Sequence, residues 1–71
     1  MSPEELKQLE KAVKKNKLLA IENVMELHGL IEDRLPSAYK ELMEMAQATY
    51  DACAAWDEAV EKLKAAESEV A

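Results

Sequence analysis

A histidine and a glutamate four residues apart have the spacing best suited to chemistry in this chain. In a helix, His28 and Glu32 lie one turn apart, so their side chains can approach each other. Two ligands do not complete a metal site. The Glu-x-x-His spacing of di-iron bundles is also absent, because Met25 stands three residues before the histidine. We predict no metal and no cofactor, with His28 and Glu32 as the only weak metal candidates.

One segment of the chain is basic although the net charge is −6, a value that argues against general nucleic-acid binding. Residues 7–17 carry five lysines and a single acidic residue, Glu10. We interpret residues 11–17 of this segment as an ion-pair edge beside three acidic residues of a second helix, Asp57, Glu58 and Glu61. The alternative is an RNA-binding face made by four of the lysines, Lys7, Lys11, Lys14 and Lys15.

Neither catalysis nor membrane insertion is indicated. There is no Gly-rich phosphate loop and no nucleophile paired with a base, so we expect no enzymatic activity. No stretch resembles a secretory signal, and the longest aliphatic run, residues 18–21, is far short of the ~20 apolar residues that cross a bilayer. We therefore expect a cytoplasmic protein without a membrane partner.

The composition predicts an all-α chain. With 71 residues, 49% hydrophobic residues, one glycine and two prolines, it fits a single helical unit better than a sheet protein. We predict one domain over residues 1–71. It consists of a helix over about residues 3–33, a turn at about 34–37 and a second helix over about 38–69.

Local signals mark where these helices begin. Ser2 can cap the first helix, Pro3 suits its first position, and Glu5 completes a capping box. Pro36 disfavours helical backbone in the residue before it, and Ser37 can cap the second helix. The chain should therefore reverse direction here.

Both predicted helices carry seam residues at alternating steps of three and four, over residues 6–30 and 39–70. A short connection makes the helices antiparallel, so the numbers of paired seam residues add up to about 72. The sequence thus predicts a coiled-coil-like antiparallel hairpin. Its central pairs are Ala20 with Cys53, Asn23 with Thr49, and Asn16 with Trp56.

Three polar residues occupy seam positions that usually hold apolar side chains. Asn16, Asn23 and Thr49 lie near the middle of the predicted rod. Polar residues in such positions fix register and oligomeric state at a cost in stability. We therefore interpret all three as specificity devices.

The cysteine and the aromatic residues are interpreted as packing residues. Cys53 faces Ala20 in a layer without the cationic groups that activate a thiolate, so we expect a buried free thiol. A lone cysteine fits a reducing compartment. Trp56, Tyr39 and Tyr50 are predicted to pack on or beside the seam rather than to stack on bases.

A second apolar stripe on the first helix points away from the seam. It consists of Leu18, Ile21 and Met25. A hairpin of this size rarely gains more than ~3–5 kcal/mol of net stability from its own core, so self-association is expected. We favour burial of the stripe in a rod-like homodimeric four-helix bundle. The alternative is a docking face for another protein.

The stretch LHGLIEDRLPSAYKELMEMAQATYDACAAWDEAVEKLKAAE resembles a family of short two-helix proteins encoded in nitrogen-fixation gene clusters, called Rop-like for their shape. The specific parts are Leu-His at residues 27–28, the acidic pair and Leu-Pro within residues 32–36, and Ala-Gln-x-Thr-Tyr at residues 46–50. Gly29 stands where the family usually has an acidic residue, and Arg34 separates the acidic pair from Leu-Pro. Both departures should loosen the turn.

The resemblance implies a dimeric hairpin that acts in nitrogen fixation and is not an enzyme. Our hypothesis is an adaptor that docks on a nitrogenase maturation or protection factor through Leu18, Ile21, Met25 and His28. An RNA-binding module using the lysine face is the alternative, and salt-sensitive RNA affinity would support it. A small metal-binding protein using His28 and Glu32 is a third reading, which requires co-purifying metal that a His28→Ala variant loses.

Overall fold

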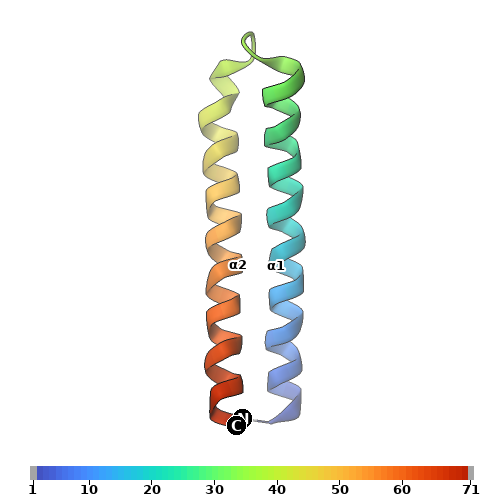
Figure 1. The fold of residues 1–71 in the computed structure, drawn as a ribbon, viewed down its shortest axis with the longest axis vertical. Coiled ribbons are helices and arrows are strands. Elements are labelled where there is room, and N and C mark those ends of the chain that lie inside the picture. Colours follow the sequence, from blue (N-terminus) through green and yellow to red (C-terminus); the bar gives the residue numbers. More distant parts are fainter. Residues whose placement is uncertain (1, 71) are drawn as a thin grey trace.

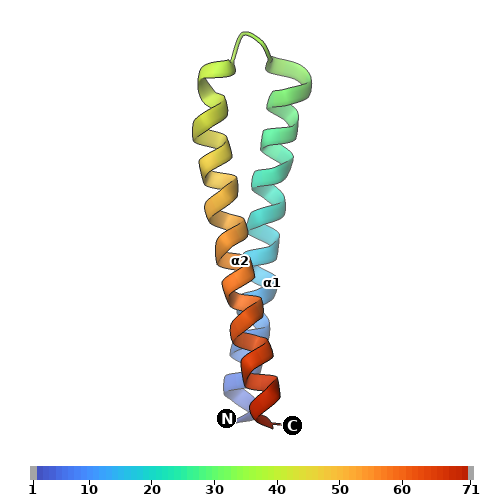
Figure 2. The same cartoon turned by 60° about the vertical axis from the view of Figure 1, so that its left-hand side comes forward.

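Two long helices packed side by side form the whole architecture. The computed structural model describes residues 2–70, with α1 (Pro3–Gly29) and α2 (Leu42–Val70) running antiparallel in a rod of 52 × 14 × 13 Å (Figure 1). Turned by 60°, the helices separate near the tip and overlap at the other end, so they wind around each other (Figure 2). The predicted all-α antiparallel hairpin is confirmed.

The start of α1 is fixed by the predicted cap. Ser2 has extended backbone (φ −77°, ψ 156°), and its Oγ accepts a hydrogen bond of 3.2 Å from the N–H of Glu5. A proline occupies the first turn, where a missing N–H costs nothing. The predicted Ser2 cap and the position of Pro3 are therefore confirmed.

The end of the first helix is wider than a regular α-helix. Residues Leu30–Arg34 form a π-helical turn, in which the N–H of Leu35 donates to the carbonyl of Leu30 at 3.1 Å. A π turn closes over one more residue than an α turn, so the end of the first helix is wider just before Pro36. Leu35 is extended (φ −83°, ψ 150°), as expected before Pro36, and the peptide bond between them is cis.

The second helix does not begin with the predicted serine cap. Ala38, rather than Ser37, stands at the cap position of a 3-10 turn, Tyr39–Glu41, that leads into α2, and no side chain caps it. Backbone carbonyl groups of the turn accept hydrogen bonds from the N–H groups that a side-chain cap would otherwise bind. Ala38 donates to Arg34 at 2.9 Å, and Tyr39 donates to Pro36 at 3.1 Å. The backbone of the turn thus replaces the side-chain cap.

The structure places the helices in the register expected from the turn. Thr49 Oγ1 lies 3.4 Å from the backbone carbonyl of Asn23, its expected partner, and 2.8 Å from that of Met45 on its own helix. The polar side chains of the seam otherwise bond within their own helix. Asn16 and Asn23 each donate at 2.8 Å to the carbonyl group four residues earlier.

The hairpin has a small core. Among the described residues, the buried apolar side chains are Ala20, Leu30, Ala59 and Ala66. Leu30 is the only large side chain in this part of the chain that is fully buried. Ala59 and Ala66 lie next to the predicted seam positions of the second helix, so α2 turns this flank of small residues toward α1. Seam residues such as Cys53 and Trp56 are left half-buried, which corrects the expected burial of the Cys53 thiol. The side chain of Val70 lies outside the described part.

Replacing Gly29 with alanine is expected to stabilise the hairpin by about 0.5–1 kcal/mol. Gly29 has ordinary helical backbone (φ −60°, ψ −40°), and a Cβ atom there would meet no neighbouring atom within 4 Å. Alanine therefore gains helix propensity without a clash. The midpoint of urea unfolding, measured at one fixed protein concentration, should rise. A lower midpoint would contradict the absence of neighbouring atoms around the added Cβ atom.

Candidate interaction surface

The predicted partner-binding residues share one exposed column on α1, which we call the outer stripe. It consists of Leu18, Ile21, Met25 and His28, which follow one another at steps of three, four and three. The first three are 59%, 40% and 68% exposed, and His28 is also exposed. The structure therefore brings the four residues together on one surface.

Further apolar side chains are exposed outside the outer stripe. Val24 on α1, Ile31 in the π-helical turn and Met43 on α2 are not among the residues predicted from the sequence, although all are exposed. Val24 and Ile31 each follow a stripe residue by three positions and lie seven residues apart. This seven-residue spacing is the signal that could have identified them as an exposed column.

The prediction that Tyr39 and Tyr50 pack on or beside the seam is wrong, since their side chains are 61% and 71% exposed. Tyr39 lies in the 3-10 turn at the tip, before the regular packing of α2 begins. Tyr50 follows the seam residue Thr49, so its side chain is turned ~100° away from the contact with α1. Both tyrosines therefore belong to the surface.

The ion-pair edge predicted for the lysines of residues 11–17 is wrong. None of these lysines lies within ion-pair distance of a carboxylate among residues 2–70. Glu58 and Glu61 instead pair within α2, with Lys62 at 3.6 Å and Lys64 at 3.9 Å, because residues one turn apart are nearer than the facing helix. Lys17 lies over the ring of Trp56, 6.0 Å from its centroid, which is a cation–π arrangement.

The histidine and glutamate at the end of α1 form a pair at the surface. His28 Nε2 lies 3.0 Å from Glu32 Oε1, and both side chains are well exposed. Within residues 2–70, no group of three histidine, cysteine, aspartate or glutamate side chains could hold a metal ion. The pair can serve as a polar end to the outer stripe.

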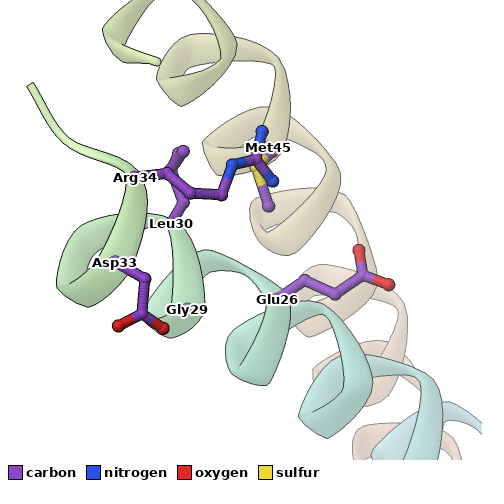
Figure 3. A pocket seen from close by; sticks show the side chains of 6 residues that line it. All are labelled: Glu26, Gly29, Leu30, Asp33, Arg34 and Met45. Atoms are coloured by element: carbon purple, nitrogen blue, oxygen red, sulfur yellow. The ribbon is translucent and has the colours of Figure 1, made fainter. Parts of the chain in front are cut away.

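A hollow of about 300 Å³ lies beside the tip. Figure 3 shows Arg34 reaching across it toward Met45 of α2, whereas Asp33 points away from Met45. The guanidinium of Arg34 also bonds the carboxylate of Glu41. This hydrogen bond, and then the charge of Arg34, hold the pKa of Glu41 below its usual value. The same hydrogen bond, and then the charge of Glu41, raise the pKa of Arg34. The pair ties the end of the first helix to the start of the second.

A second hollow, of about 290 Å³, lies between the helices toward the open end of the rod, and we call it the alanine groove. Both helices line it with small, apolar and charged side chains, of which Ala59 is buried whereas Glu58 and Lys62 are exposed. Its lining consists of Leu9, Ala12 and Asn16 from α1, and Ala55, Glu58, Ala59 and Lys62 from α2. Asn16, one of the predicted specificity residues, therefore faces this groove.

Comparison with known proteins identifies the family of this hairpin. A family model described as Rop-like matches residues 4–68, which include nearly all of α1 and α2. The chain belongs to the Rop-like family. No curated protein and no solved structure matches it. Membership suggests a small helical protein-interaction module, and Rop-like proteins typically form dimers.

The Rop-like hairpin thus has two surfaces of different character. The alanine groove lies between α1 and α2, and the outer stripe lies on α1 alone. No helix in the part of the chain that the structure describes is both long and apolar enough to cross a membrane.

Proposed function

We propose that this Rop-like protein is a homodimeric, non-enzymatic adaptor in nitrogen fixation, which docks on a nitrogenase maturation or protection factor. The observation that carries this proposal is the outer stripe, where Leu18 and Met25 are more than half exposed on a rod with a very small core. Exposed apolar columns of this kind support contact with other proteins. The process itself is inferred from the resemblance of residues 27–67 to proteins of nitrogen-fixation gene clusters.

The dimer is supported by how little the hairpin buries alone. Three of the four buried core residues in the described part of the hairpin are alanines, and a core of this size is marginal without a partner. The sequence favours burial of the outer stripe in the dimer, but we propose that the dimer contact lies at the alanine groove. A second copy in the groove would contact both helices, and small side chains such as Ala55 let helices approach closely. The outer stripe then stays available for another protein.

Capture of partners from nitrogen-fixing cells tests the proposed function. The tagged wild type should retain a nitrogenase-assembly protein, and a variant with Ile21→Glu, Met25→Glu and His28→Ala should lose it. Charges placed on the stripe would be desolvated in the complex without compensation. An Ala65→Glu variant, changed at an exposed position of α2, should behave as wild type.

Both variants must first show the same oligomeric mass as wild type, so that loss of the partner is not loss of the dimer. If the wild type captures no nitrogenase-assembly protein, or if the stripe variant captures it equally well, the proposed docking is contradicted.

A further inference from the structure

The outer stripe continues toward the start of α1 as a column of lysines. Lys7, Lys11 and Lys14 precede Leu18 at steps of four, three and four, the same alternation that the stripe follows to His28. Every residue of this column is exposed. A second seam therefore runs along α1, over residues 7–28, on the side turned away from α2. At 1.5 Å per residue it is ~30 Å long, enough to seat a helix of ~20 residues.

The two halves of the column differ in chemistry. The first half carries three ammonium groups that have no ion-pair partner among residues 2–70, whereas the second half is apolar from Leu18 to Met25 and ends at His28. Glu10 is the one acidic residue among the five lysines of residues 7–17. A ligand that covers the whole column must therefore be acidic at one end and apolar at the other.

A helix of another protein fits this surface better than RNA or a lipid surface does. The alternating spacing is that of helix–helix seams, and RNA would leave the apolar half uncovered. The chain's net charge of −6 would repel phosphate groups elsewhere along the rod. A second copy of the chain is accounted for by the alanine groove.

We infer that the column Lys7, Lys11, Lys14, Leu18, Ile21, Met25 and His28 binds an amphipathic helix of the partner protein. The bound face of this helix is apolar opposite the outer stripe and acidic opposite the three lysines. This inference rests on the proposed docking function and names the chemistry of the docked segment. The apolar half supplies most of the affinity, and the charged half fixes the direction and the register in which the helix lies.

Selection from a displayed library of helical 24-residue peptides tests the inference. Every position on one face of the peptide is varied among Leu, Glu, Lys and Ser, and the wild-type dimer is the target. Peptides that bind should carry Glu at one end of that face and Leu at the other. Selection of no binder, or of binders with Glu spread evenly along the face, would overturn the inference.

Charge reversal then locates the acidic end of the selected peptide. A variant with Lys7→Glu, Lys11→Glu and Lys14→Glu should bind it on the order of tenfold more weakly, because three exposed ion pairs become repulsive contacts. A control variant with the same change in net charge, but at exposed lysines outside the column, should bind as wild type. It carries Lys15→Glu, Lys40→Glu and Lys64→Glu. Equal weakening of both variants would overturn the inference.

Two further measurements separate the possible failures. One outcome is that the triple lysine-to-glutamate variant of the column still captures the nitrogenase-assembly protein that the stripe variant loses. In that case the adaptor function holds, and the inference of a helix with an acidic end is wrong. If the wild type binds a fluorescent oligouridine or phosphatidylserine vesicles through the same three lysines, and no peptide is selected, the column serves a phosphate-bearing ligand and the inference is wrong.

Discussion

Replacing Leu30 with alanine is expected to destabilise the protein by about 2–5 kcal/mol, the range found when large buried side chains are truncated. Leu30 is 1% exposed and is the one large side chain that is fully buried in the described part of the hairpin. Since small cores supply only ~3–5 kcal/mol of net stability, the variant should lose most of its helix at low micromolar concentration. Circular dichroism during urea unfolding measures this loss.

The neighbouring residue provides the control for this experiment. Ile31 has nearly the same volume as Leu30 but is 54% exposed, so an Ile31→Ala variant should unfold within about 0.5 kcal/mol of wild type. Both variants truncate a large aliphatic side chain in the same turn, but only Leu30→Ala removes a core side chain. Equal destabilisation by the two changes would show that the tip is not organised around Leu30.

Ala55→Glu is expected to abolish the dimer. Ala55 lines the alanine groove, and in a two-fold dimer the change introduces two carboxylates into one small interface. Burial of unpaired charges costs several kcal/mol, more than a contact between small side chains can offset. Sedimentation equilibrium should show a monomer, and the helix content should fall because the hairpin core is small.

The adjacent alanine separates a change in the interface from a change in helix propensity. Ala54 is exposed and does not line the groove, so Ala54→Glu adds the same charge to the same helix and should leave the dimeric mass unchanged. A dimeric Ala55→Glu protein would place the contact between copies elsewhere on the rod.

Features set by neighbouring residues could be predicted from the sequence. The Ser2 cap and the extended backbone before Pro36 depend on one or two side chains, and both occur as expected. The pairing of Thr49 with Asn23 follows from counting outward from the turn. Repeated spacing also identified the outer stripe, because helix geometry alone decides which residues form a column.

Features set by competition between distant groups could not be predicted in this way. Ala59 is buried because α2 is rotated toward its small flank, and this rotation depends on both packing surfaces at once. Glu58 and Glu61 pair with lysines of their own helix, because side chains one turn apart are nearer than the lysines of α1. The π turn Leu30–Arg34 lies just before a proline, and the three-four spacing of the seam residues does not predict it.

The position of the outer stripe on one helix, away from the groove between the two, has a consequence for stoichiometry. A two-fold dimer joined at the groove would display two identical stripes, one from each copy. Such an adaptor is bivalent, so a partner with two copies of the docked helix would gain avidity from the local concentration of the second site. Two separate partner molecules would instead be held on one rod at a fixed distance from each other.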